Sequence, residues 1–235
     1  MCGRYTLTRQ EDLVEDLEAS LGESAQGEWW KPRFNVAPTQ PAPVVLVRDG
    51  ARKIEMLRWG LVPFWGGRAG SKPPLMINAR IESVADKAVF RDALDRKRCL
   101  VPADGFFEWL KEGKAKHPIY LHPEPRHTIA FAGLWARAKT DTGDLLSFTI
   151  ITGPANTLVA PIHDRMPVVL APGSYAQWLD PSVDGETARK LLGVPPVADW
   201  VATPVSQHVN SALHDDASCI EPVAGDSPAQ GTLFD

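Results

Sequence analysis

Short apolar segments, each ended by proline, glycine or polar residues, are the feature of this sequence that most restricts its fold. Segments of this length and composition are typical of β-strands. They follow one another along most of the chain with few helical patterns between them, which favours antiparallel sheets over a strand–helix–strand alternation. The predicted strands span residues 42–48, 53–63, 98–102, 117–121, 128–135, 145–152, 165–170 and 200–206.

Helical patterns are fewer. Residues 8–22 predict a helix because Thr8 and Glu11 have capping-box spacing, three leucines share one face and Gly22 follows. Further helices are expected at 85–97, 173–179 and 185–193. The whole pattern predicts an α+β domain with largely antiparallel sheets, for which a barrel-like arrangement is one option.

The chain length fits one large domain. Its 235 residues, 44% of them hydrophobic, can bury a single core. We expect a domain over residues 1–210 and a flexible acidic tail over 211–235, which is polar and contains Pro and Gly. No apolar stretch approaches the roughly 20 residues of a membrane span, and no signal peptide is evident, so a soluble, cytoplasmic protein with no membrane partner is expected.

Charge and cysteine content narrow the class of protein. The net charge is −4, but six acids and no Lys or Arg lie from Asp199 onward, so residues 1–198 carry −4 + 6 = +2. A local basic groove for nucleic acid is therefore compatible with the composition. Cys2, Cys99 and Cys219 show no CxxC or Cys/His spacing, so we expect free thiols in a reducing compartment, with no metal or cofactor.

The chain begins Met-Cys-Gly-Arg-Tyr. Initiator methionine is usually removed before a small second residue, which would leave Cys2 with a free α-amine and a thiol on adjacent carbons. Both groups are nucleophiles. Cys2 is therefore the first candidate for chemistry.

Several polar side chains interrupt apolar or turn-rich segments, where a buried polar group has to be paired or used. Asn78 follows an apolar run, Glu108 lies between aromatic residues, and His163 precedes a strand together with Arg165; Arg80 follows Asn78. Each has a structural explanation: Asn78 as a turn cap, Glu108 in an ion pair with an arginine, His163 in a structural role, and Arg80 and Arg165 as solvated or ion-paired surface groups. As a set beside turns, they favour a functional site.

Six ordered motifs resemble one known family. They are MCGRY, PRFNVAPTQ, WGLVPFW, INARIE, RCLVPADGFFEW and HDRMPV, and together they run from Cys2 to about Asn210. The chain resembles the SOS response-associated peptidase (SRAP) family. The resemblance implies an α+β fold with largely antiparallel sheets in a barrel-like core flanked by helices, and covalent crosslinking to abasic sites in single-stranded DNA. It also implies a catalytic set, carried over by motif: Cys2, Asn78, Glu108 and His163.

One residue departs from the family pattern, because Phe107 stands where many relatives have tyrosine. In the implied reaction the Cys2 amine condenses with the abasic aldehyde to an imine, and the thiol closes a thiazolidine ring. A desolvated Glu108 would have a raised pKa and act as general acid/base. His163 is a second acid/base candidate, and Asn78 is expected to hold the amine by a hydrogen bond.

DNA is expected to bind through phosphate contacts and stacking rather than base reading. Packing in the core is the alternative for the aromatic side chains. Arginine and threonine side chains are expected at phosphates, and proline and tryptophan at bases. The candidates are Arg4, Arg80, Thr152, Arg165, Pro38 and Trp65.

The last residues, QGTLFD, resemble the Q-x-x-L-F pattern by which flexible peptides dock on the bacterial sliding clamp, with Gln230, Leu233 and Phe234 as the matching positions. The chain is otherwise expected to be a monomer at the nucleoid.

Two other functions use the same residues. In an N-terminal-nucleophile thiol peptidase or amidohydrolase, Cys2 would attack an acyl carbon with its own amine or His163 as base, and removal of Met1 could be autocatalytic. In a non-covalent reader of damaged bases, the aromatic and arginine side chains would suffice. A lyase-type activity could accompany crosslinking.

Overall fold

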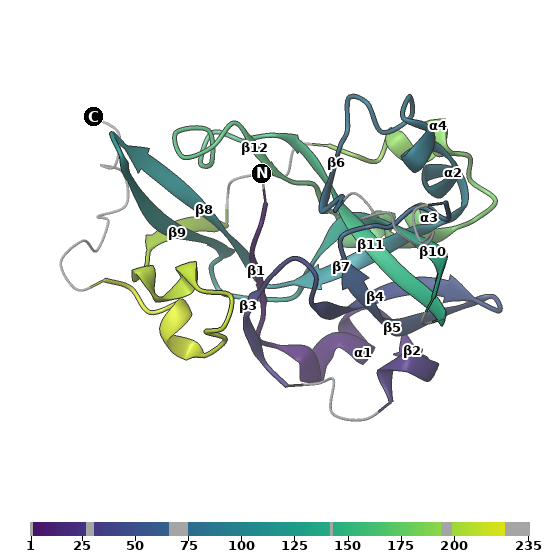
Figure 1. Ribbon diagram of the computed structural model, residues 1–235, viewed down its shortest axis with the longest axis horizontal. Coiled ribbons are helices and arrows are strands. Elements are labelled where there is room, and N and C mark those ends of the chain that lie inside the picture. The colour runs from purple at the N-terminus through teal and green to yellow at the C-terminus, as the bar shows by residue number, and fades with distance from the viewer. Residues whose placement is uncertain (1, 27–30, 66–74, 142, 194–198, 224–235) are drawn as a thin grey trace.

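The computed structural model describes residues 2–26, 31–65, 75–141, 143–193 and 199–223 (Figure 1). The strands are β1 (Tyr5–Leu7), β2 (Ser20–Leu21), β3 (Arg33–Val36), β4 (Pro41–Arg48), β5 (Ala51–Trp59), β6 (Asn78–Arg80), β7 (Arg98–Ala103), β8 (Gly105–Glu112), β9 (Ala115–Pro123), β10 (Ile129–Thr140), β11 (Gly143–Pro154), β12 (Arg165–Pro167), β13 (Val169–Leu170) and β14 (Trp200–Pro204). The α-helices are α1 (Leu13–Asp16), α2 (Ala88–Arg96), α3 (Tyr175–Leu179) and α4 (Gly185–Arg189), and the 3₁₀ helices are η1 (Gln10–Asp12), η2 (Glu23–Ala25), η3 (Pro172–Ser174), η4 (Gln207–Asn210) and η5 (Ala217–Cys219).

A closed barrel lies at the centre of the fold. Strands β5, β4, β7, β10 and β11 are antiparallel neighbours in that order, and β11 closes the ring by pairing in parallel with β5. The β4–β5 hairpin turns at Asp49 and Gly50, which both have positive φ, as a two-residue type I′ turn requires. Helices α2, α3 and α4 lie on one side of the barrel (Figure 1).

A second sheet, in the order β14-β9-β8-β1-β3, leaves the barrel from the end of β7. Strands β7 and β8 are almost continuous, and Asp104 at their junction is fully buried. Its carboxylate accepts hydrogen bonds from the Thr6 hydroxyl, from the Thr8 hydroxyl and from the Thr8 backbone N–H at 2.7 Å. Strand β1 is thereby fixed where the two sheets meet.

Tyr5 inserts β1 into the aromatic core. Its ring centroid is 5.2 Å from that of Trp59 and 6.0 Å from that of Phe131, both edge-on. Phe106 of β8 reaches the same cluster, 6.2 Å from Phe131. Edge-to-face aromatic pairs stabilise the fold beyond the effect of burial alone. A shift of β1 along its axis would break these pairs, so they hold the strand in one position.

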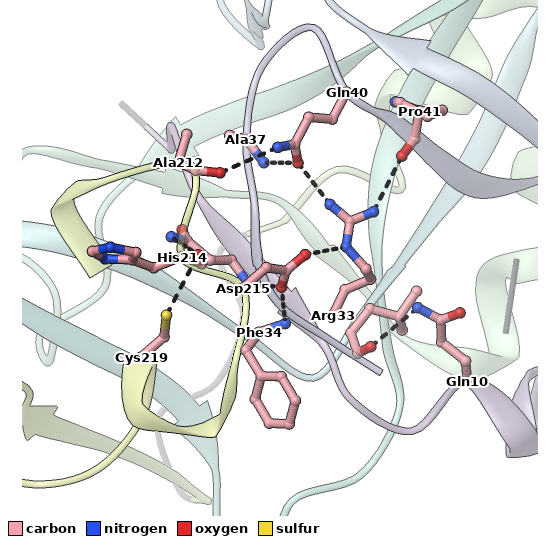
Figure 2. Close-up of polar contacts among 12 residues, drawn as sticks. Gln10, Arg33, Phe34, Ala37, Gln40, Pro41, Ala212, His214, Asp215 and Cys219 are labelled. Atoms are coloured by element: carbon pink, nitrogen blue, oxygen red, sulfur yellow. Dashed lines mark hydrogen bonds and ion pairs between the residues drawn. The ribbon is translucent and has the colours of Figure 1, made fainter. Parts of the chain in front are cut away.

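The segment after β14 packs against β3 (Figure 2). The Asn35 side-chain amide donates to the carbonyls of Val209, Ser211 and His214 at 3.1, 2.9 and 2.7 Å. The Asp215 carboxylate accepts from the backbone N–H groups of Phe34 and Asn35 at 2.6 and 2.9 Å and pairs with Arg33. Packed structure therefore continues past residue 210 to residue 223, and residues 224–235, with the clamp-like motif, lie outside the described part.

The predicted fold class is confirmed, since mostly antiparallel strands form a barrel with few helices. Each predicted strand segment contains a strand, and the helices expected at 85–97, 173–179 and 185–193 are present in shortened form. Among the described residues, no helix is long and apolar enough to cross a membrane.

The helix predicted over residues 8–22 is wrong in extent and in its cap. The α-helical part covers Leu13–Asp16, and Glu18 has a φ of 47° that turns the chain into β2. The Thr8 side chain binds Asp104 instead of capping the helix. Arg52 donates to the Leu17 carbonyl at 3.0 Å, and pairing of β2 with β5 outweighs the helical pattern.

Candidate active site at the N-terminal strand

Strand β1 places Cys2 beside the middle of β8. Tyr5 pairs with Phe106, and the Phe107 N–H donates to the Arg4 carbonyl at 3.0 Å, so the antiparallel pairing continues toward the N-terminus. Cys2 is fully buried. The predicted nucleophile is thus held in the core only three residues from the aromatic anchor Tyr5.

Asn78 holds the main chain of Cys2. Strand β6 pairs in parallel with β11, with Asn78 opposite Ile150, and Asn78 Nδ2 donates to the Cys2 carbonyl oxygen at 2.8 Å. The predicted partner was the Cys2 α-amine, so the observed bond goes to the other end of the residue. Asn78 Oδ1 is buried and accepts no hydrogen bond from the residues that the structure describes. This oxygen is an acceptor next to Cys2.

Glu108 is almost completely buried on β8, at 3% exposure. Its strand neighbours Phe107 and Trp109 pack in a separate hydrophobic cluster, while Phe106 packs in the main core. Side chains alternate along a strand, so Glu108 points to the same side as Phe106. Burial raises the pKa of the Glu108 carboxyl, and His163 acts in the opposite direction. The expected raised pKa is confirmed, although Phe107 and Trp109 point away.

The Cys2 thiol is protonated in this environment. Burial raises its pKa far above the usual range, and the negative charge of Glu108 adds to the effect. The thiol donates weakly to the Arg4 carbonyl, with an Sγ–O distance of 3.7 Å. A reaction at sulfur therefore needs a nearby base to take the proton, and Glu108 is close enough to influence the thiol electrostatically.

His163 lies in the loop that connects β11 and β12. Its backbone N–H donates to the Val159 carbonyl at 2.9 Å, which fixes the loop. The ring Nδ1 is 3.0 Å from the Arg165 N–H and also 3.0 Å from Asp164 Oδ1. An unprotonated Nδ1 can accept a hydrogen bond from the Arg165 N–H, and a protonated Nδ1 can donate one to Asp164 Oδ1. Nδ1 therefore has a partner in either tautomer of the ring.

Two of the predicted catalytic residues, Glu108 and His163, line a cavity of about 360 Å³. It is lined by Glu108, Trp109, Lys111, Lys116, His163 and Asn210. The Trp109 indole N–H donates to Asn210 Oδ1 at 2.7 Å across this lining. Glu108 of β8 and His163 of the loop before β12 therefore both contribute to the lining of one cavity.

Lys111 and Lys116 are binding candidates that the sequence interpretation missed. They lie directly opposite each other on β8 and β9, both exposed. Like charges in facing strand positions are unfavourable unless an anion compensates them. The signal was present in the sequence as the lysine-rich stretch KEGKAK around the hairpin turn.

Two of the predicted phosphate-binding arginines are engaged within the protein. Arg4 donates to Asn35 Oδ1 at 3.0 Å and to the carbonyls of Val209 and Asn210 at 2.8 and 3.3 Å, which uses three of its five N–H donors. Arg165 forms an ion pair with Glu82, the structural alternative considered for it.

The other predicted DNA contacts differ in exposure. The Thr152 side chain is fully buried and its carbonyl accepts from Arg165 at 2.7 Å, whereas Arg80 is exposed at the end of β6. Pro38 is half-buried in the β3–β4 turn. Trp65 is 43% exposed and packs edge-on against Phe64, beside a small separate hollow rather than in the Glu108 cavity.

The comparisons with known proteins agree on one family. The model of the family described as SOS response associated peptidase (SRAP) matches residues 1–212. Abasic site processing protein YoqW of Bacillus subtilis is 38% identical over 230 residues, covering 94% of this chain and 99% of the relative. Abasic site processing protein YedK of Escherichia coli is 31% identical over 230 residues, covering 95% and 100%.

The fold has a close match among solved structures. A protein from Bacteroides thetaiotaomicron superposes with a TM-score of 0.82 at 24% identity, covering 94% of this chain and 99% of that protein. At this identity the match concerns the fold alone. It extends over nearly the whole chain.

The raised pKa of Glu108 predicts a pH-dependent stability cost. Below about pH 4, near the ordinary glutamate pKa, the carboxyl is neutral in both folded and unfolded states. As the pH rises through the folded-state pKa, the buried group ionises unfavourably and the folded state loses stability. Glu108→Gln should therefore be more stable than the wild type at pH 8, with a smaller difference at pH 4, in urea unfolding. An equal difference at both pH values would contradict the raised pKa.

Proposed function

The chain belongs to the SOS response-associated peptidase family, and we propose that it captures abasic sites in single-stranded DNA as a covalent adduct of Cys2. The observation that carries this proposal is a buried Cys2 whose carbonyl is bound by Asn78, beside a carboxyl of raised pKa. The relatives named abasic site processing proteins support the choice of DNA lesion. A DNA-processing role also agrees with the lysines at the cavity.

The proposed chemistry needs Cys2 at the chain end, after Met1 is removed. The α-amine adds to the aldehyde of the ring-opened sugar, and the carbinolamine loses water to give an imine. The Cys2 sulfur then adds to the carbon of the protonated imine, whose nitrogen keeps its hydrogen, while the thiol proton passes to a base. The product is a five-membered thiazolidine, and the whole sequence releases one water.

This route depends on proton transfer, because the Cys2 thiol is neutral at the start and has to lose its proton. Glu108 can deliver a proton to the leaving hydroxyl of the carbinolamine, and the resulting carboxylate can accept the thiol proton as sulfur attacks. His163, on the other side of the cavity, is suited to protonate the sugar ring oxygen as it opens. Asn78 Oδ1 can accept from the α-amine while Nδ2 keeps the carbonyl in place.

The first test is a denaturation-stable adduct. Mixing the protein with single-stranded DNA that carries one abasic site should give a species whose mass is protein without Met1 plus DNA minus one water. Cys2→Ala should form none of it. Cys2→Ser keeps the amine but cannot form the sulfur ring, so it should form a stable adduct only when borohydride reduces the imine.

Two outcomes of this experiment would favour the other functions. Turnover of an amide or ester substrate without a DNA adduct would support a thiol hydrolase. Equal DNA binding by wild type and Cys2→Ala, without an adduct in either, would support a non-covalent reader. Cys99→Ala is the matched control, because Cys99 is buried in β7, in the barrel wall.

We also propose that Lys111 and Lys116 bind phosphates near the abasic site. Each lysine that neutralises a phosphate of a single strand contributes about 0.7 to the slope of log K against log salt concentration. The Lys111→Ala/Lys116→Ala variant should bind DNA more weakly at low salt, with a slope reduced by about 1.4. Lys190→Ala, near the end of α4, is the control. An unchanged slope in the double variant would exclude these contacts.

We propose that the peptidase activity named in the family description is, in this chain, the removal of its own Met1. The Cys2 sulfur would add to the Met1 carbonyl carbon, the peptide C–N bond would break with a proton passing to the new amine, and water would hydrolyse the thioester. Glu108 is the base available to the thiol. Lyase-type strand cleavage would follow if the imine loses its 3′ phosphate before the ring closes.

For the tail, we propose docking on the sliding clamp through Gln230, Leu233 and Phe234. Deletion of residues 229–235 should abolish retention by immobilised clamp while leaving adduct formation intact. Leu233→Ala/Phe234→Ala should do the same, whereas Thr232→Ala, at a variable position of the pattern, should retain binding. Unchanged retention of the deletion variant would exclude the motif.

A further inference from the structure

Three potential metal ligands meet in the segment after β14. His208 in η4, Asp216 just before η5 and Cys219 at the end of η5 each offer one ligand atom, and these atoms lie within 4.8 Å of one another. Cys219 is fully buried, while His208 and Asp216 are partly open to solvent. The spacing lacks the CxxC or Cys/His patterns of common zinc motifs, which is why the sequence predicted no metal.

Hydrogen bonds within the segment hold these ligands in position. Asp216 Oδ1 accepts from the Ser218 N–H at 3.0 Å, which directs Oδ2 to His208 Nε2, also at 3.0 Å. The His208 ring stacks on the His214 ring at a centroid distance of 3.8 Å and an angle of 7°. Side chains fixed by neighbouring groups lose little freedom on binding, a requirement of a good metal site.

Cys219 is directed into the same region. Its thiol lies 3.6 Å from the His214 carbonyl oxygen (Figure 2). A bound divalent cation would supply the positive charge that a thiolate buried at this position needs.

We propose that His208 Nε2, Asp216 Oδ2 and Cys219 Sγ bind a zinc ion, with water as the fourth ligand. Nitrogen, carboxylate and thiolate ligands together suit zinc, at about 2.0–2.3 Å from the ion. Small side-chain rotations bring atoms within 4.8 Å to the roughly 3.5 Å separation of tetrahedral ligands. Binding breaks the hydrogen bond between His208 Nε2 and Asp216 Oδ2 and takes Nε2 without its hydrogen, so the neutral ring carries its one hydrogen on Nδ1. The sulfur binds as thiolate and its proton passes to solvent.

The ion would act on the part of the fold that supports the active site. The segment it closes contains Val209 and Asn210, whose carbonyls accept hydrogen bonds from Arg4, and Asn210 also lines the cavity at Glu108. Zinc would therefore stabilise the segment that holds the Arg4 side chain. This role is independent of the chemistry proposed for Cys2.

The test uses cobalt(II) as a spectroscopic substitute for zinc in the full-length chain after treatment with chelator. An N-terminal cysteine can itself chelate metal through its amine and thiol, so all measurements are made in the Cys2→Ala background. One equivalent of cobalt should produce a thiolate-to-metal charge-transfer band. Zinc should displace the cobalt and raise the unfolding temperature by about 5 °C at a hundredfold excess over Kd.

Variants identify the ligands. Cys219→Ala should remove the charge-transfer band, whereas Cys99→Ala should retain it. Asp216→Asn keeps an oxygen for the Ser218 N–H but loses the charge, and should weaken cobalt binding at least about tenfold. Circular dichroism checks that each variant is folded, and Asp216→Asn tests the site even where Cys219→Ala does not fold. Absence of the band in the Cys2→Ala protein, or wild-type cobalt affinity in Asp216→Asn, would overturn the proposal.

Discussion

The insertion of β1 between β3 and β8 is the constraint on which the site depends. Tyr5 packs against Trp59 and Phe131 inside the barrel, so the chain can neither slide nor peel away without opening the aromatic core. Because Cys2 is only three residues earlier, its position is set by core packing rather than by flexible loop contacts. Residues near an N-terminus are usually mobile in proteins, but Cys2 is part of the interior here.

The same strand connects the two halves of the molecule. Asp104, at the junction of β7 and β8, binds β1 through Thr6 and Thr8, while Arg4 binds the carbonyls of the C-terminal segment. Glu108 lies four residues beyond Asp104 on the almost continuous β7–β8 segment. Cys2, the proposed nucleophile, and the Glu108 carboxyl are therefore placed by one set of strand pairings, which explains how a carboxyl group of raised pKa can be held in a fixed place.

The sequence predicted the strands well, because strands depend on local patterns, whereas the catalytic roles of Cys2, Asn78, Glu108 and His163 stay predictions. A glutamate among aromatic residues indicated a buried carboxyl, and Glu108 is buried. Features that depend on long-range pairing were missed. The helix expected over residues 8–22 ends early because β2 pairs with β5, and the facing Lys111 and Lys116 become apparent only from the strand register. Likewise, His208 and Cys219 meet only because the chain folds back between η4 and η5.

Burial of the Cys2 sulfur has a consequence for selectivity. A thiol with no exposed surface is shielded from soluble electrophiles and oxidants in the cell. Under the proposed function, an intact nucleotide brings a base that has to fit into the same space as its sugar. A sugar that has lost its base is narrower. The protein would then recognise damage by exclusion of volume, without any contact that reads a base.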